Sequence, residues 1–210
     1  MKIAIMQPYF SPYLGYFQLI NEVDTFVFYD DVNFIKGGWI NRNFININKE
    51  LKRFTIPLIN SSSFRKINEI EVNWECKDMG KLIKTFHQNL QDKTIFNKIL
   101  EIKPKTIADM AILSITLSCE YLGISTNFKR SSELDFERQN DKILNLVEIC
   151  KLEKATQYIN PEGGQNLYTK EQFSQYGIDL KFMKGTNTPS ILEIINTPGL
   201  IDKLNNYVLI

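Results

Sequence analysis

Several groups on which enzymes commonly rely are scarce in this chain of 210 residues. It has one histidine, His87, and three cysteines without a C-x-x-C pair, which excludes a histidine-rich metal site. We therefore expect no resident metal. His87 lies in an apolar helical pattern, which favours a structural position. Proton transfer at neutral pH then depends on His87, a carboxylate, a lysine or a tyrosine.

The chain also lacks an excess of charge and any long apolar run. Its net charge is +1, which gives no overall electrostatic reason to expect DNA or an anionic membrane as a partner. No stretch is long enough for a membrane-spanning helix, and the first residues do not resemble a secretory signal. The odd number of cysteines favours buried thiols in a reducing compartment, so we expect a cytoplasmic protein.

What the chain has in quantity is apolar surface, with 43% hydrophobic residues, which is enough for a core without disulfides. Short apolar or alternating runs at 2–6, 24–29 and 52–59 predict strands, and helical spacing dominates from 77 to 122. Strands and helices alternate again toward the C-terminus. The pattern predicts an α/β fold: one domain over residues 1–210, with a mainly parallel Rossmann-like sheet flanked by helices and a helical insert around 77–122.

In such folds ligands bind beyond the carboxyl ends of the strands, and four polar segments of this chain occupy such positions. The first is "QPYFSPYLGY" (7–16), where two prolines fix the backbone and tyrosines crowd a predicted turn. We assign Gln7, Tyr9, Tyr13, Gly15 and Tyr16 to substrate binding, with the rings as walls and free N–H groups of the following helix as an anion site. The alternative is a tight crossover whose rings fill the core.

The second segment is "DDVNFIKGGWINRN" (30–43), which combines acids, cations, amides and an aromatic ring. Asp30 or Asp31 is the candidate general base, and Lys36 and Arg42 are candidate catalytic cations for a diphosphate or an oxyanion. Trp39 offers a stacking face. The alternative is a turn followed by a solvated charge cluster. The residues assigned to the site here are Asp30, Asp31, Lys36, Trp39, Asn41, Arg42 and Asn43.

The third and fourth segments carry hydroxyls and glycines. Ser131 and Ser132 follow two cations and are typical of a phosphate-binding loop, although serine is also a common helix N-cap. Gly163, Gly164 and Tyr168 lie in "PEGGQNLY", a flexible turn whose amides suit sugar hydroxyls. An ordinary strand-to-helix connection is the alternative. We find no Walker loop, no G-x-G-x-x-G and no Ser-His-Asp order.

Two resemblances follow from these segments. The spacing of the first one is similar to that of HIGH-type nucleotidyltransferases, but Tyr13 and Tyr16 stand where those enzymes carry histidines. Over essentially the whole chain, "MQPYFSPYLGYFQLI", "DTFVFYDDVNFIKGGWINRN", "SSEL" and "ATQYINPEGGQNLY" resemble the WbqC-like family of bacteria. That resemblance implies that the four segments form one site.

The WbqC-like resemblance also implies a function in O-antigen and lipopolysaccharide biosynthesis, as a glycine or other aminoacyl transferase acting on amino sugars. We expect an enzyme that acylates the amine of a nucleotide-linked amino sugar. The amino acid donor is either ATP-activated, with ATP and Mg²⁺ as cosubstrates, or an aminoacyl-tRNA. The alternatives are a non-catalytic sugar- or nucleotide-binding module of the same pathway and a HIGH-like nucleotidyltransferase.

Overall fold

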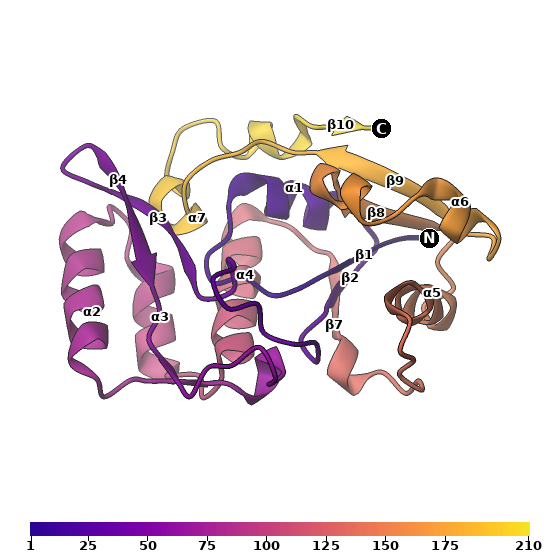
Figure 1. Cartoon of the computed structure of the whole chain (residues 1–210). Coiled ribbons are helices and arrows are strands. Elements are labelled where there is room, and N and C mark those ends of the chain that lie inside the picture. Colours follow the sequence, from indigo (N-terminus) through magenta and orange to yellow (C-terminus); the bar gives the residue numbers. More distant parts are fainter.

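A six-stranded, mostly parallel sheet forms the centre of the computed structural model, which describes all residues from 1 to 210 (Figure 1). The strand order is β10-β9-β8-β1-β2-β7, and only the edge pair β10–β9 is antiparallel. This confirms the predicted α/β fold with a parallel sheet. The strands are β1 (Lys2–Met6), β2 (Thr25–Phe28), β7 (Asn127–Arg130), β8 (Gln157–Pro161), β9 (Asp179–Lys184) and β10 (Val208–Leu209).

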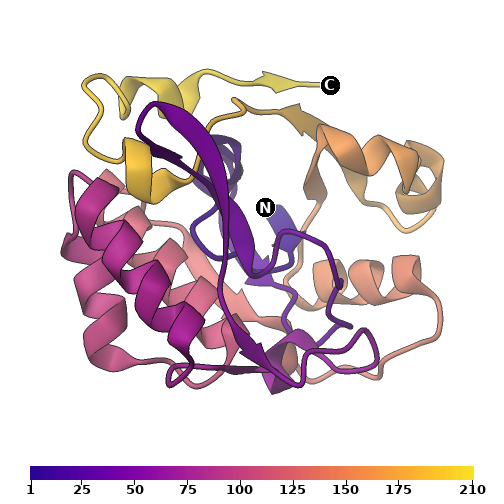
Figure 2. The same cartoon turned by 60° about the vertical axis from the view of Figure 1, so that its left-hand side comes forward.

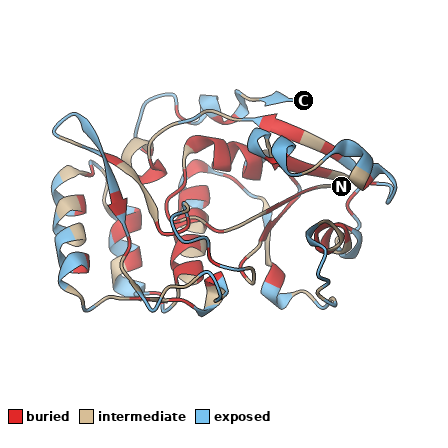
Figure 3. Cartoon of the chain, viewed as in Figure 1, coloured by how far each residue is buried: buried red, intermediate tan, exposed pale blue.

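The inner strands are apolar because both faces of the sheet are covered. Side chains alternate between the faces, so Ala4 joins a core of 39 buried residues while Ile3 and Ile5 join a second core of 13. In the same way, Phe26 packs into the larger core and Val27 into the smaller. Figure 3 shows this burial along β1 and β2. A nearly continuous apolar run is what a parallel strand with two covered faces requires.

The helices divide between these two cores. Helices α1 to α4 contribute to the larger core, and α5 and α6 cover the other face. The helices are α1 (Leu14–Glu22), α2 (Lys77–Asn89), α3 (Thr94–Ile102), α4 (Ile107–Leu122), α5 (Lys142–Leu152), α6 (Lys170–Ser174) and α7 (Ile191–Ile194). Four short 3₁₀ turns lie at Ile67–Glu69, Ser131–Glu133, Glu162–Asn166 and Asp202–Asn205. None of the helices has the length and apolar character needed to cross a membrane.

The predicted helical insert is confirmed as α2, α3 and α4. It is interrupted twice: at 90–93, which was not predicted, and around Pro104, as predicted, because proline cannot donate the backbone hydrogen bond that would continue α3. Thr106 then caps α4 by accepting a hydrogen bond from the Asp109 N–H at 3.1 Å. Gly123 ends α4 with φ of 71°, a left-handed conformation that suits glycine.

Two small antiparallel hairpins lie outside the main sheet. The larger pairs β3 (Arg42–Ile47) with β4 (Glu50–Thr55), and the smaller pairs β5 (Leu58–Ile59) with β6 (Glu71–Val72). The single strand predicted at 52–59 is therefore wrong, because Pro57 separates β4 from β5. The β3–β4 hairpin lies beside α7 in two views (Figures 1 and 2), and the Ser190 N–H donates to the Phe44 carbonyl at 3.2 Å.

The start of α1 is fixed against the chain that leaves β9. Gly15 and Gly185 meet so closely that a Cβ built on Gly185 would lie 2.8 Å from the Gly15 Cα atom. The Gly15 N–H donates to the Thr186 carbonyl at 3.0 Å, and the Leu14 N–H donates to Thr188 Oγ1 at 3.0 Å. These contacts position the residues on both sides of the pocket described below.

We predict that Gly185→Ala lowers the free energy of unfolding by about 1–3 kcal/mol, because the added methyl group meets backbone that cannot move aside. Gly80→Ala is the matched control, since Gly80 lies inside α2 and a Cβ there meets nothing within 4 Å. That variant should gain about 0.5–1 kcal/mol from helix propensity. Urea denaturation measures both changes, and a Gly185→Ala variant as stable as the wild type would contradict the close-contact argument.

Candidate functional site

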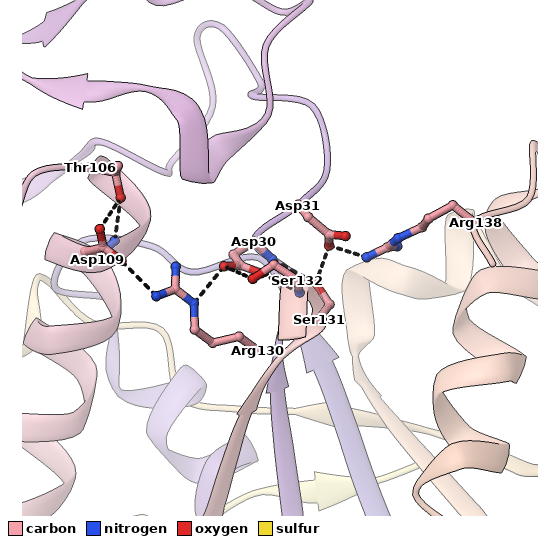
Figure 4. A network of polar contacts seen from close by, with 8 residues as sticks. All are labelled: Asp30, Asp31, Thr106, Asp109, Arg130, Ser131, Ser132 and Arg138. Carbon is pink, nitrogen blue, oxygen red and sulfur yellow. Dashed lines mark hydrogen bonds and ion pairs between the residues drawn. The ribbon is translucent and has the colours of Figure 1, made fainter. Parts of the chain in front are cut away.

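A network of charged and hydroxyl side chains occupies the carboxyl ends of β2 and β7 (Figure 4). These strands are parallel neighbours, with Phe28 opposite Arg130, so the residues that follow each strand leave the sheet side by side. Asp30 and Asp31 therefore meet Ser131–Ser132, although about 100 residues separate them in the sequence. The polar ends predicted for these two strands thus come together.

The Asp30 carboxylate is fully buried and is surrounded by donors. Its Oδ1 accepts from the Ser132 N–H at 3.1 Å and lies 3.3 Å from the Ser131 hydroxyl. Its Oδ2 accepts from Arg130 Nε at 2.8 Å and from the Ser132 hydroxyl at 2.9 Å. A charge withdrawn from water needs such partners, and a carboxylate with both oxygens occupied is an anchor rather than a free base.

Arg130 extends this network from the sheet to the helical insert. Its Nη1 donates to Asp109 Oδ1 at 2.8 Å, in the first turn of α4, and the Thr106 hydroxyl donates to Asp109 Oδ2 at 2.6 Å. Burial by itself lowers the pKa of Arg130, but the hydrogen bonds and charges of Asp30 and Asp109 outweigh it and raise that pKa. The guanidinium therefore stays charged and ties β2, β7 and α4 together.

Asp31 lies at the outer side of the network, and only one of its two carboxylate oxygens is hydrogen-bonded. Its Oδ1 accepts from the Ser131 hydroxyl and from Arg138, whereas its Oδ2 has no hydrogen bond within the chain. The Arg138 guanidinium lies over two rings, 4.9 Å from the centre of Tyr29 and 4.5 Å from that of Phe136. Of the two predicted carboxylates, Asp31 is the one that keeps a free oxygen.

A pocket of about 560 Å³ lies between the start of α1, the β3–β4 hairpin and the chain that follows β9. It brings together four of the predicted site residues, Tyr9, Tyr13, Trp39 and Asn43. Its volume falls within the range of small-molecule sites. The pocket is lined by Tyr9, Pro12, Tyr13, Trp39, Asn43, Phe44, Leu51, Asn187, Thr188 and Pro189.

The pocket walls are aromatic rings and neutral polar groups, without Asp, Glu, Lys, Arg or His. Burial, with a smaller effect of Tyr13, raises the pKa of Tyr9 to about 12, and burial also raises the pKa of Tyr13. Both phenols therefore keep their protons at neutral pH and can donate hydrogen bonds. The Asn43 amide is already used within the chain, since its Nδ2 donates to the Ser11 carbonyl at 2.7 Å and its Oδ1 accepts from the Phe44 N–H at 2.8 Å. Asn187 adds an amide donor and acceptor. This pocket suits an uncharged ligand with several hydroxyl or amide groups.

Two predicted residues of the first segment lie in the protein interior instead. Tyr16 is 1% exposed, and its hydroxyl donates to the Gln7 carbonyl at 2.9 Å, so we leave it out of the candidate site. Gly15 lies in the close backbone contact with Gly185 described above. The first N–H groups of α1 are also occupied, since the Tyr16 N–H donates to the Tyr13 carbonyl at 3.1 Å. The predicted anion site at this helix start is therefore filled by the protein itself, which also argues against a HIGH-type phosphate site.

Three further predicted residues of the second segment, Lys36, Asn41 and Arg42, do not line the pocket. Lys36 is exposed and forms no ion pair. Asn41 is buried; its Nδ2 donates to the Ile56 carbonyl at 2.8 Å, and its Oδ1 has no partner. Arg42, half-buried at the start of β3, has a buried Nε atom without a hydrogen bond.

The fourth segment lies at the end of β8, apart from the pocket lining. A Cβ on Gly164 would lie 2.0 Å from the Asn160 side-chain oxygen, so this glycine is required by packing, whereas Gly163 faces open space. Tyr168 packs edge-on against Phe173, with 5.9 Å between the ring centres. Tyr168 also lies close to Tyr29, whose pKa is raised mainly by burial and to a small extent by Tyr168, so this segment adjoins the carboxylate network through the ring below Arg138. The predicted segments thus form a pocket group and a carboxylate group, and the prediction that they share one ligand stays a prediction.

Sequence reasoning missed several residues that the structure adds to the site. Asp109 and Arg138 complete the network, and the β4 residue Leu51 and the segment 187–189 complete the pocket. Segment 187–189 had a usable signal, because "TNTP" follows a strand at its carboxyl end. Asp109 and Arg138 had none, since each meets its partner only through the tertiary fold. Nowhere do three His, Cys, Asp or Glu side chains gather in a group that could hold a metal ion.

The fold and the site define a Rossmann-like α/β protein whose pocket and polar network are built from segments that follow parallel strands. The chain belongs to the WbqC-like protein family, whose model matches residues 7–190. It is also similar to the uncharacterized protein Rv1507c of Mycobacterium tuberculosis (strain ATCC 25618 / H37Rv), with 27% identity over 186 residues, which cover 84% of this chain and 79% of that protein. No solved structure matches the chain.

We predict that Arg130→Met lowers the free energy of unfolding by about 3–5 kcal/mol, because it leaves the buried Asp30 carboxylate without its cation. The control is Lys81→Met, which removes an exposed ion pair with Asp78 and should cost at most about 1 kcal/mol. Chemical denaturation followed by circular dichroism measures both. Equal losses would show that the network stabilises the protein no more than a surface pair does.

Proposed function

We propose that this protein acylates the amine of a nucleotide-linked amino sugar with an amino acid, glycine, during the synthesis of bacterial surface polysaccharide in the cytoplasm. The observation that carries the proposal is the neutral pocket walled by Tyr9, Tyr13 and Trp39. The acyl transfer itself is taken from the resemblance to the WbqC-like family. The proposal therefore has a binding part and a chemical part, and each can be tested separately.

The binding part rests on the chemistry of the pocket walls. A sugar presents C–H groups on its ring faces and hydroxyls at its edges. The rings of Trp39 and Phe44, whose centres lie 5.7 Å apart, offer apolar surfaces for such a face. The protonated phenols of Tyr9 and Tyr13 and the amide of Asn187 offer hydrogen bonds for the edges. The shape and neutrality of the pocket favour a sugar over a free phosphate.

The chemical part is formation of an amide bond. The nitrogen lone pair of the sugar amine attacks the carbonyl carbon of an activated glycine, the carbon–oxygen bond to the activating group breaks, and the amine loses a proton. The leaving group is AMP when ATP activates glycine, or the 3′ end of the tRNA when glycyl-tRNA is the donor. A neutral amine, a proton acceptor and a stabilised oxyanion are the requirements of this step.

Among the predicted catalytic residues, we assign proton acceptance to Asp31. Its Oδ2 has no partner, while its Oδ1 is held by Ser131 and Arg138, so the carboxylate is fixed in orientation with one oxygen available. Asp30, with both oxygens occupied, is a positioning residue that holds Ser131 and Ser132 beside it. The sequence left open which aspartate is the general base. We assign that role to Asp31 and a positioning role to Asp30.

A second candidate function is favoured by one observation. The pocket lining contains no Asp, Glu, Lys, Arg or His, so no general base with a near-neutral pKa lies in the walls. A protein that binds a sugar nucleotide for another enzyme needs only such a pocket. Saturable binding of the nucleotide sugar, with no product from any donor, would establish this alternative and refute the acyl transfer.

We predict that Trp39→Ala weakens binding of UDP-glucosamine by about tenfold or more, because it removes an aromatic wall worth roughly 1–3 kcal/mol. Trp39 is 52% exposed, so the fold should survive the change. Phe64→Ala is the matched control, since Phe64 is 92% exposed and does not line the pocket. Isothermal titration calorimetry measures both affinities, and unchanged binding by Trp39→Ala would place the ligand elsewhere.

We predict that Asp31→Asn lowers the rate of acylation by about 100-fold or more, because the amide cannot accept a proton, while binding of UDP-glucosamine changes little. Wild-type protein is incubated with UDP-glucosamine, glycine, ATP and Mg²⁺, or with glycyl-tRNA. Mass spectrometry follows the addition of one glycyl group to the sugar. Asp135→Asn, at an exposed carboxylate without an ion pair, is the control and should keep full activity. Equal rates for both variants would remove Asp31 from the mechanism.

A further inference from the structure

We propose that Arg42 and Arg53, on the outer face of the β3–β4 hairpin, bind the diphosphate of the nucleotide-linked ligand at the edge of the pocket. This inference rests on the proposed function, because it concerns how the same ligand is held. It adds Arg53, which no sequence pattern indicated, and it fixes the direction in which the ligand lies.

The register of the hairpin places the two arginines on one face. Arg42 lies opposite Thr55, and Phe44 lies opposite Arg53. Opposed residues of an antiparallel pair share a face, and so do residues two apart along a strand. Arg42, Phe44 and Arg53 therefore project from the same side, together with Leu51 at the next position of β4. Phe44 and Leu51 line the pocket, so the arginines flank its hairpin wall.

Neither arginine has an anionic partner within the chain. Arg53 is exposed and forms no ion pair, whereas its neighbour Lys52, on the opposite face, pairs with Glu50 at 3.1 Å. Arg42 forms no ion pair either, and its Nε is buried without a hydrogen bond. Buried polar atoms without partners are rare, because each costs free energy that a hydrogen bond would recover. A ligand cannot reach this buried Nε, but it can contact the terminal Nη1 and Nη2 atoms of Arg42, which form no hydrogen bond within the chain.

The surrounding segment is strongly basic, although the whole chain is close to neutral. Residues 32–66 contain seven lysines and arginines and one acidic residue, Glu50, a net charge of +6, against +1 for all 210 residues. The hairpin itself, residues 42–55, carries four cations and Glu50, a net charge of +3. One acid from outside lies against it, because Glu193 Oε2 accepts from the Asn46 N–H at 2.8 Å. The field at the hairpin is therefore positive, although this acid reduces it. Such a field attracts an anion to this side of the pocket.

The two parts of this surface match the two parts of one ligand. The pocket is neutral and suits the sugar, whereas the adjoining face is cationic and suits phosphate. Arginine binds phosphate through two parallel N–H groups, and two arginines on diagonal positions of a hairpin, about 7–8 Å apart, can each take one phosphate of a diphosphate. The sugar then lies against Trp39 and Phe44, and the diphosphate lies across Arg42 and Arg53.

The test compares three probes, UDP-glucosamine, UDP and glucosamine, by isothermal titration calorimetry at low and at moderate salt. Arg53→Ala should weaken both UDP-containing probes by about 10- to 100-fold and leave glucosamine unchanged, because only the phosphates lose a charged hydrogen bond. Lys52→Ala is the matched control, one residue away on the other face, and should match the wild type. The affinity for UDP should also fall as salt increases.

A second variant separates binding from folding at the half-buried position. Arg42→Lys keeps the charge but cannot form two parallel hydrogen bonds, so it should fold and still lose about tenfold in UDP affinity. Equal weakening by Lys52→Ala and Arg53→Ala, or no change in either arginine variant, would overturn the proposal. A single-stranded RNA that binds the hairpin without displacing UDP would also overturn the proposal. It would show that the two arginines contact a nucleic acid and that UDP binds elsewhere.

These results are distinguishable from failure of the proposed function. Arginine-dependent binding of UDP without any acylated product would refute the acyl transfer and leave the diphosphate site standing. Acylation that proceeds in Arg53→Ala with an unchanged KM for UDP-glucosamine would refute the diphosphate site and leave the acyl transfer standing.

Discussion

The structure depends on one buried charge. Asp30 follows the second strand in a position without contact to water. Its carboxylate is stable there because Arg130 and the Ser132 hydroxyl donate to one oxygen and the Ser132 N–H donates to the other. Those donors come from the neighbouring strand, and Arg130 in turn holds Asp109 at the start of α4. The requirement of a single carboxylate therefore sets the positions of the sheet edge, the loop after β7 and the helical insert.

The two aspartates of this network differ in how completely their oxygens are hydrogen-bonded. Asp30 is fully occupied, so the free oxygen of Asp31 is the group available to a reacting proton. The pocket walls are neutral and carry protonated phenols, while the cations lie outside the walls on the hairpin. The neutral pocket, the carboxylate network and the arginines of the hairpin thus lie on different structural elements.

Much of the fold could be predicted from the sequence, because the spacing of apolar residues indicates which positions of a strand or helix are buried. Apolar runs marked β1 and β2, helical spacing marked α2 to α4, and the rule that parallel strands end at one edge brought Asp30 and Asp31 to Ser131 and Ser132. The rest depended on contacts between distant segments. Whether a tyrosine faces a ligand or the core, as for Tyr13 and Tyr16, is decided by which chain packs over it, and local sequence carries no signal of that.

The segment that follows β9 has two tasks. Thr186 and Thr188 receive the first N–H groups of α1, and the residues from Asn187 to Pro189 form one side of the pocket. A chain that stopped at Gly185 would lose the pocket and also leave the amino end of a central helix without acceptors. That stretch therefore cannot be exchanged as if it were an independent surface loop, because each new sequence there must also supply acceptors for the start of α1.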